Sequence, residues 1–594
     1  MMGPGRTRYR GTDQLMTDKK PTYDATRRRL LRATGAIGIA GLAGCQSATS
    51  PEGGNDSGNG SGGAGGNDSG NGSGGAGGND SDGENGSANE SGTATESGGG
   101  ASGDGGRLTF AQVKSPIEFD PIVLNDVPSD QVASLVFDPL YTYDESTEIV
   151  PQIAAEQPEV ENDGKRYVVE LNGDATFQNG DPVTAEDVTY SFTAPVEEET
   201  ENAGEFDMID TVEAVDDSTV QFDLKFPFGA FKSYLTASVV PKSVREDDKD
   251  AFNTESPVGA GPFTFEGWQE GDFARVKRWE DYWGDPQPNL AEVEFVPVEE
   301  GTTRITTLKS GENDIVEEIP PKSWETVRGM GDSSIEAVPG IGYFYLAFNC
   351  KKGPTTDPKV REAIDHTVSM DQAVKNFVEP TGVRQYSPLP AVLSEEWNMP
   401  VDEWKQIPKD KDVDKAKSML DDNDNVPDDW NGTIIVPPDD KREQIGTSVA
   451  NGLKEAGYGA SVQRLDWGAF LEKYVTGEPD DYNMYTLGWA GSPDPDSFLY
   501  FLFAQEEEGV GNGAFYRNDE VDSAIMDARQ STERSERQEL YQQAITTILE
   551  DRAHLPAYNL KNSFGVKDYV SDFTSHPVSS FSIVSDYNNV SVEK

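Results

Sequence analysis

The sequence predicts a fold of the α/β class, either α/β or α+β, with several lobes and a cleft between them. The part that can form a core runs from Arg107 to Lys594, about 490 residues, which is too long for one hydrophobic core. Strand-like runs dominate the early part of this body, and helical periodicity dominates later. A strand–helix–strand pattern at 433–465 is typical of parallel strand pairing. These three observations predict a multi-lobed body.

Short runs rich in β-branched and aromatic residues predict strands early in the body. They lie at 108–113, 167–171, 219–226 and 291–298. Farther along, apolar runs at 434–436 and 460–465 flank a helical segment at 442–456, which Gly457 ends. We expect this later segment to form a βαβ unit.

Two apolar stripes predict helices. The first follows a helix start at 356–358, where Pro358 occupies the first turn. Its positions, spaced as on one helix face, are Val360, Ala363, Ile364, Thr367 and Val368. The second stripe consists of Leu540, Tyr541, Ala544, Ile545, Ile548 and Leu549.

Acidic residues dominate the charge. Asp and Glu number 106 against 49 Lys and Arg, a formal net charge of −57. Self-repulsion on that scale destabilises a compact state in dilute buffer, whereas at 1 M salt the Debye length falls to about 3 Å. The composition therefore indicates a halophilic protein. An acidic face for a cationic partner is a weaker interpretation because the acids are spread along the chain, and the same sign of charge disfavours nucleic acid.

Cysteine and histidine are too few and too scattered to indicate metal or nucleophile chemistry. The cysteines are Cys45 and Cys350, and the histidines are His366, His554 and His576. No His-x-x-x-His or Cys-x-x-Cys spacing occurs, so we expect neither a metal site nor a cofactor. Cys350 lies in an apolar strand pattern, which favours a small buried residue over a nucleophile.

Residues 26–45 resemble an export signal followed by a lipidation site. Arg27 and Arg28 open a basic stretch, and about eleven small or apolar residues follow, too few to cross roughly 30 Å of hydrocarbon. The arginine pair resembles a twin-arginine signal, which exports folded proteins. The Leu-Ala-Gly-Cys at 42–45 resembles a lipobox, so we expect lipidation of Cys45 and a location on the extracellular face of the cell membrane. The alternatives are a chance match or a short membrane anchor.

Residues 46–106 predict a disordered tether. They are mostly Gly, Ser, Asn, Asp and Ala, and the unit at 53–64 recurs at 65–76. A segment with so little apolar surface cannot offset its chain entropy by burial. Its Asn-x-Ser sequences are possible glycan acceptors. No run of 18 apolar residues follows Cys45, so the body is not expected to contain a membrane-spanning helix.

Five stretches carry a family resemblance. The most specific, at 177–192, predicts a strand, a tight turn at Asn179-Gly180, and a helix capped by Thr184 with Asp187 in the capping-box position. The other four lie at 257–284, 346–364, 488–499 and 555–558. In this order they resemble the substrate-binding proteins of ABC importers, in the oligopeptide, dipeptide and nickel-binding group known as solute-binding protein family 5.

The resemblance implies a periplasmic-binding-protein-like fold, in which two lobes enclose a central cleft and a further domain is added (the cluster C type). It suggests three domains, of which two are continuous in sequence. Domain I would comprise about 107–136, 212–340 and 557–594, domain II about 137–211, and domain III about 341–556. Such a protein would act as a monomer that closes on its solute and would have an ABC permease and ATPase as partners.

The resemblance also implies where ligand binds. In the family a Gly-Trp-x-x-Asp sequence lines the cleft, and in peptide-binding members its Asp pairs with the α-ammonium of the peptide. Here Trp489 matches, but Ser492 stands at the Asp position and the loop is one residue shorter. Asp494 and Asp496 are candidates to replace the missing carboxylate, with turn capping as the alternative role.

Aromatic residues on two predicted strands are further candidates. Tyr343 and Tyr345 alternate onto one face of the strand that enters the third domain, and Tyr558 matches a family position beside the cleft. Aromatics at such places can line a pocket. Core packing is an equally good interpretation for the tyrosines and a weaker one for Trp489.

Other classes of function explain the sequence less well. A surface hydrolase lacks a Gly-x-Ser-x-Gly elbow and an evident catalytic pair, so no enzyme activity is expected. An adhesin would fit the charge and the tether but not the five stretches. A ligand-presenting sensor uses the same closing cleft as an importer protein, and the sequence does not separate the two. We expect the ligand to be a di- or oligopeptide, and the alternative is a sugar, an opine or a metal chelate.

The charge leads to a first prediction. The body 107–594 should lose its cooperative fold as salt falls below about 1 M, because screening of the acidic surface weakens. Circular dichroism at a series of KCl concentrations measures this. Full stability in dilute buffer would contradict the halophilic interpretation.

Overall fold

The computed structural model describes residues 105–578 and 581–594. The predicted export signal with Arg27 and Arg28, the predicted lipidation site Cys45 and nearly all of the tether lie outside the described residues. No helix in the described part combines the length and the apolar character that crossing a bilayer requires.

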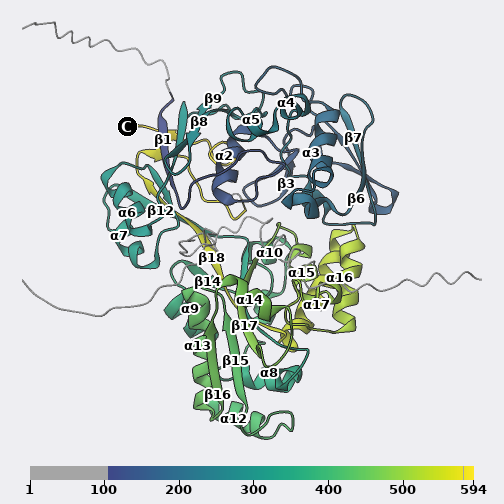
Figure 1. Cartoon of the computed structure of the whole chain (residues 1–594), viewed down its shortest axis with the longest axis vertical. Helices are drawn as coiled ribbons and strands as arrows, with labels where there is room; N and C mark the ends of the chain where they lie inside the picture. The colour runs from purple at the N-terminus through teal and green to yellow at the C-terminus, as the bar shows by residue number, and fades with distance from the viewer. Residues whose placement is uncertain (1–104, 579–580) are drawn as a thin grey trace, which may run out of the picture. The chain divides into compact units, whose positions relative to one another are not determined.

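One large mixed sheet organises the body (Figure 1). Its strands are β1 (Arg107–Gln112), β8 (Phe263–Gln269), β9 (Phe273–Arg278), β10 (Glu292–Pro297), β11 (Ile315–Glu317), β12 (Ser333–Pro339), β13 (Gly342–Phe348), β14 (Gly382–Arg384), β15 (Asn431–Val436), β16 (Gly459–Arg464), β17 (Met484–Ala490) and β18 (His554–Lys567). They follow the order β16-β15-β17-β13-β18-β11-β1-β10-β9-β8, and β12 and β14 also pair with β18.

Strand β18 joins two halves of this sheet. Its first half pairs with β13 and β14, and its second half pairs with β11 and β12. In Figure 1, β1, β8, β9 and β12 lie above β18, and β15, β16 and β17 lie below it. We call residues 105–341 the first lobe and residues 342–553 the second lobe. The chain after β18 packs on the first lobe, where Phe581 stacks on Phe110 with ring centroids 4.0 Å apart.

Smaller sheets complete the first lobe and the chain that packs on it after β18. Their strands are β2 (Tyr141–Tyr143), β3 (Ile149–Pro151), β4 (Glu159–Glu161), β5 (Arg166–Glu170), β6 (Ile209–Ala214), β7 (Thr219–Leu224), β19 (Val570–Ser571) and β20 (Ser591–Val592). The four-stranded sheet has the order β4-β5-β7-β6, so the chain passes the domain border predicted near 211 without leaving this sheet. The domain boundaries stay predictions. The strands predicted at 108–113, 167–171, 219–226 and 291–298 are confirmed as β1, β5, β7 and β10.

Sixteen α-helices occur among the described residues. They are α2 (Val127–Val136), α3 (Ala185–Glu197), α4 (Lys242–Asp247), α5 (Lys249–Thr254), α6 (Gly301–Ser310), α7 (Trp324–Arg328), α8 (Pro358–Asp365), α9 (Met370–Phe377), α10 (Ala391–Glu396), α11 (Val401–Trp404), α12 (Val413–Asp421), α13 (Asp440–Glu455), α14 (Trp467–Tyr474), α15 (Asp496–Phe503), α16 (Asp519–Gln530) and α17 (Arg534–Glu550).

The local predictions for the helices hold with one difference. The capping box of α3 is present, with Thr184 and Asp187 bonded reciprocally, and Gly180 before it has the left-handed φ of 88°. The predicted βαβ unit is β15-α13-β16, with parallel strands. The predicted apolar stripe reaches Val368, but α8 already ends at Asp365. Just after the helix, the Thr367 hydroxyl donates to the Ile364 carbonyl at 2.7 Å, a local side-chain bond that competes with continuing the helix.

Candidate functional site

A cavity of about 1260 Å³ lies where the two lobes meet. First-lobe residues line it from α2, from the β2–β3 hairpin and from the 3₁₀ helices η2 (Glu201–Phe206) and η3 (Phe231–Tyr234). Second-lobe residues line it from the end of β17 and from the loop that follows to α15. This volume exceeds the roughly 300–1,000 Å³ of most ligand pockets, so the cavity has room for an extended solute.

Trp489 lines the cavity from the end of β17. Its indole Nε1 donates to the Ser497 carbonyl at 2.7 Å, and its ring stacks on Phe501 with centroids 4.0 Å apart. Phe501 also lines the cavity. The hydrogen bond and the stack hold the indole in one orientation, which suits a wall against which a ligand can pack.

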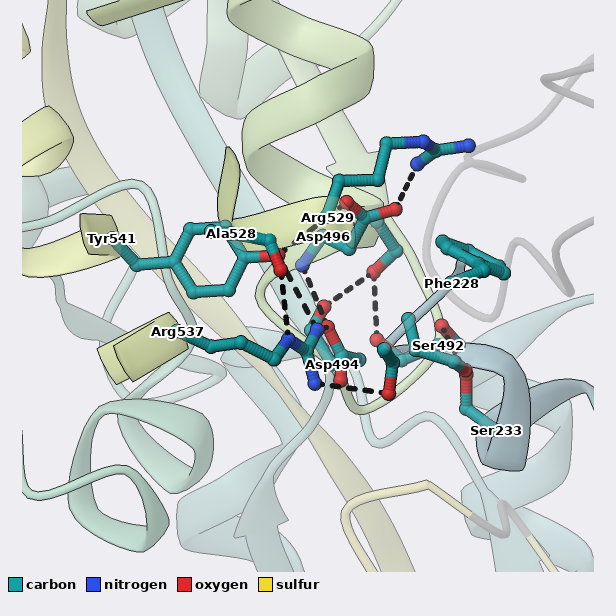
Figure 2. A network of polar contacts seen from close by, with 12 residues as sticks. Phe228, Ser233, Ser492, Asp494, Asp496, Ala528, Arg529, Arg537 and Tyr541 are labelled. Carbon is teal, nitrogen blue, oxygen red and sulfur yellow. Dashed lines mark hydrogen bonds and ion pairs between the residues drawn. The ribbon is translucent and has the colours of Figure 1, made fainter. Parts of the chain in front are cut away.

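Ser492, at the position of the expected carboxylate, also lines the cavity. Its hydroxyl oxygen accepts from the Ser233 hydroxyl at 3.5 Å. Ser233 belongs to η3 of the first lobe, so this contact spans the two lobes (Figure 2). Ser492 carries no charge and cannot form an ion pair with an ammonium group.

The two neighbouring carboxylates already have cationic partners. Arg537 Nη2 donates to Asp494 Oδ1 at 2.6 Å, and Arg529 pairs with Asp496 (Figure 2). The Tyr541 hydroxyl adds a longer bond to Asp496 Oδ1 at 3.4 Å. Asp496 lines the cavity, and burial raises its pKa to about 6 although Arg529 opposes this shift. Asp494 lies outside the lining.

Tyr345 and Tyr558 lie in the core of the second lobe and not in the cavity lining. Tyr345 stacks on His554 with centroids 4.1 Å apart, and Tyr343 stacks on Tyr345 at 4.7 Å. Tyr558 stacks on Phe344 at 4.7 Å. The predicted binding set is therefore divided: the structure brings Trp489, Ser492 and Asp496 to the cavity, and it packs Asp494 and the tyrosines behind it.

The two arginines also hold a segment of the opposite lobe. The Gly229 amide donates to the Arg529 carbonyl at 2.9 Å, and Arg537 Nη1 donates to the Gly229 carbonyl at 3.2 Å. The Arg529 guanidinium lies 4.5 Å from the ring centroid of Phe228 and 3.7 Å from that of Tyr500. We call the two hydrogen bonds of Gly229 the Gly229 clamp. It joins the lobes close to Asp494, because Arg537 contacts both Gly229 and Asp494.

The cavity lining is strongly acidic, a feature that the sequence reasoning missed. The only basic residue in the lining that the structure describes is Arg529. The acids are Asp130, Asp138, Asp174, Glu201, Glu205, Asp207, Asp285, Asp496, Glu507 and Asp586. Most of them come from the first lobe and belong to no recognisable motif, and in so acidic a sequence nothing distinguishes them.

Glu205 differs from the other lining acids. It is half-buried, and its carboxylate has no hydrogen bond or ion pair with any described residue. Burial raises the pKa of Glu205 to about 8, because desolvation disfavours the charged form and no cation compensates. Asp138, by contrast, accepts from the Tyr282 hydroxyl at 3.1 Å, although burial raises its pKa to about 7.

Comparison with known proteins agrees with this architecture. Residues 148–509 match the family model of bacterial extracellular solute-binding proteins, family 5, middle region. The oligopeptide-binding protein AppA of Bacillus subtilis is 25% identical over 499 residues, covering 80% of this chain and 90% of AppA. The glutathione-binding protein GsiB of Pectobacterium atrosepticum is 28% identical over 446 residues, covering 73% of this chain and 84% of GsiB.

A solved structure shows the same fold. That of AppA from Bacillus subtilis in complex with a nonapeptide matches with a TM-score of 0.65 at 22% identity, covering 83% of this chain and 99% of that one. The fold and the inter-lobe cavity define a solute-binding protein. The chain belongs to the family 5 extracellular solute-binding proteins, which are non-enzymatic binding proteins of ABC importers. The family resemblance and the fold class expected from the sequence are confirmed.

The raised pKa of Glu205 generates a prediction about stability. Its folded-state pKa lies above that of the unfolded chain, so the stabilising contribution of the protonated form is complete below about pH 4.5 and is lost as pH rises through about 8. Replacing Glu205 with Gln removes this loss. At 2 M KCl we expect Glu205→Gln to melt at least about 2 °C above the wild type at pH 9, with a smaller difference at pH 5.

Thermal unfolding followed by circular dichroism measures the difference. Asp207→Asn, an exposed carboxyl two residues away, removes the same charge and is the matched control. If Glu205→Gln changed the melting temperature by the same amount at pH 5 and at pH 9, the Glu205 carboxyl would not be held protonated by its surroundings.

Proposed function

We propose that this protein captures a di- or oligopeptide outside the cell and delivers it to an ABC permease, with Cys45 as its lipid anchor. It would act as a monomer in the three-domain arrangement predicted from the sequence. The observation that carries the proposal is the inter-lobe cavity of about 1260 Å³ in a chain of this family. Relatives named for oligopeptide and glutathione binding support a ligand with peptide bonds.

The cavity offers the kinds of group that hold a peptide. Trp489 and Phe501 form an aromatic wall on the second lobe, and Ser492 and Ser497 add hydroxyl groups beside it. The carboxylate for an α-ammonium cannot come from Ser492, and Asp496 is already paired with Arg529. The ammonium would therefore meet the acids of the first lobe. The missing carboxylate at 492 also keeps a non-peptide solute as a second candidate.

Binding and closure constitute the whole mechanism in this proposal. A solute would bind to one lobe, and the other lobe would close on it by a hinge motion. The Gly229 clamp and the Ser233–Ser492 contact would form on closure, because each joins the lobes beside the cavity. Arg537 is buried and Arg529 is half-buried, and both are already paired with carboxylates, so closure would not require an unpaired charge to be desolvated.

The test of ligand class is the compound that copurifies. Residues 107–594 produced in a high-salt host should carry a short peptide at stoichiometric occupancy, identified by mass spectrometry after mild unfolding. Calorimetric titration of the released compound should restore one-to-one binding. A sugar, an opine or a metal chelate at the same occupancy would replace the peptide proposal with its alternative.

Closure can be tested at Gly229. A Cβ atom at this position would lie 2.1 Å from the Ser531 carbonyl oxygen and 2.9 Å from Arg537 Cδ, so Gly229→Ala must push the lobes apart. We expect it to weaken binding of the copurified compound about tenfold or more, which corresponds to roughly 1.4 kcal/mol. Small-angle scattering should show a larger radius of gyration with ligand present.

Gly173→Ala is the matched control, since a Cβ there meets nothing within 4 Å. It should leave both measurements unchanged. Wild-type affinity in Gly229→Ala would show that the clamp plays no part in closure.

A further inference from the structure

The cavity lining has a higher ratio of acidic to basic residues than the chain as a whole. The whole sequence has 106 acidic and 49 basic residues, about two to one. Among the described residues, the lining has ten acidic residues and one basic residue, Arg529, which is itself paired with Asp496. An acidic surface adapted to high salt would leave the composition of the cavity close to that of the rest of the chain. The enrichment therefore indicates selection for a positively charged occupant.

Glu205 is the acid whose surroundings most favour a ligand cation. It is half-buried and lines the cavity, and no described residue donates to it or pairs with it. An ionised carboxylate so placed is costly unless an opposite charge approaches it. A cation from solution would supply that charge, and the carboxylate would then be ionised in the complex. The other half-buried or buried acids of the lining, Asp138, Asp496 and Glu507, already have partners.

The position of Glu205 also fits a bound side chain. It belongs to η2 of the first lobe, and its neighbours Phe206 and Met208 line the cavity with it. Tyr234 lines the cavity too. Its pKa is raised chiefly by burial and additionally by Asp496 and Glu205, so the phenol lies within electrostatic reach of both carboxylates. An apolar and aromatic surface beside a carboxylate suits the long stem and charged head of Arg or Lys.

A second unsatisfied acceptor lies on β18. Asn559 is fully buried and lines the cavity, and its Oδ1 accepts no hydrogen bond within the described part of the chain. Its amide nitrogen donates to the Gly340 carbonyl at 2.7 Å, which fixes the side chain. A buried acceptor without a protein donor is completed by water or by a ligand. The cavity thus holds a free carboxylate on one lobe and a free amide oxygen on β18.

We propose that the cavity selects peptides with a cationic side chain, Arg or Lys, and that the Glu205 carboxylate is the residue that sets this preference. The inference rests on the proposed function and adds the charge class of the peptide. The guanidinium or ammonium group of the side chain pairs with Glu205, and the stem packs against the apolar surface beside it. The Asn559 amide oxygen accepts a hydrogen bond from another part of the same peptide.

The experiment is calorimetric titration of the ligand-stripped body with three tripeptides of equal length. Ala-Arg-Ala, Ala-Gln-Ala and Ala-Glu-Ala share their termini, so differences in affinity report the central side chain. Titration at 2 M KCl screens exposed charges beyond about 3 Å and leaves direct contacts. We expect the wild type to bind the Arg peptide at least about tenfold more tightly than the Gln peptide, and the Glu peptide least tightly.

Two variants assign the preference. Glu205→Gln keeps the shape of the side chain and should reduce the ratio of Arg to Gln affinity to near one. Asp174→Asn removes an exposed lining acid and should keep the wild-type ratio. Circular dichroism establishes that both variants are folded. If the ligand pairs directly with Glu205, the two variants should differ in their ratio of Arg to Gln affinity at 2 M KCl. If the preference came from the summed field of all the lining acids, the two variants should behave alike.

The outcomes are distinct. Equal binding of the Arg and Gln peptides by the wild type, or an unchanged ratio in Glu205→Gln, overturns this inference and leaves peptide binding intact. Failure of all three peptides to bind overturns the proposed function and this inference with it. A preference that Glu205→Gln abolishes and Asp174→Asn retains supports both.

Discussion

The single strand β18 is the constraint on which the arrangement of the two lobes depends. Along its length the hydrogen-bonding partners change from β13 and β14 to β11 and β12. A strand satisfies its backbone groups only when neighbours flank it, so both halves of the sheet must assemble around this one segment. The first half of β18 thereby belongs to the second lobe and its second half to the first lobe, which places the cavity beside the crossing. Asn559 lies on this strand and in the lining of the cavity.

A second theme is the pairing of buried charges beside the cavity. Arg529 and Arg537 satisfy Asp496 and Asp494 from α16 and α17, and the same two arginines form the Gly229 clamp. Breaking one buried pair would leave its partner uncompensated, at a cost of about 3–5 kcal/mol. The loop after Trp489 is consequently held in place, and its carboxylates are not free for a ligand. A half-buried carboxylate without a partner among the described residues lines the cavity from the first lobe, at Glu205.

Local patterns were the reliable part of the sequence reasoning. The capping box at Thr184 and Asp187, the βαβ unit, and the strands that became β1, β5, β7 and β10 all follow from side-chain periodicity and caps over a few residues. The same reasoning made Tyr345 a pocket candidate, whereas Tyr558 was a candidate through the family resemblance. Strand alternation says only which residues share a face, and both faces of β13 are covered, by α14–α17 on one side and by α8, α9 and α13 on the other.

The sequence by itself determined the class of fold, the family and Trp489 as a candidate residue of the cleft, because these depend on local motifs in a fixed order. Only the tertiary structure decided which carboxylates are available. Asp494 and Asp496 are 33 to 43 residues from the arginines that pair with them, and Glu205 is far from both in sequence. An ion pair depends on distance in space, and a sequence this rich in acids does not reveal which of them the fold leaves without a cation.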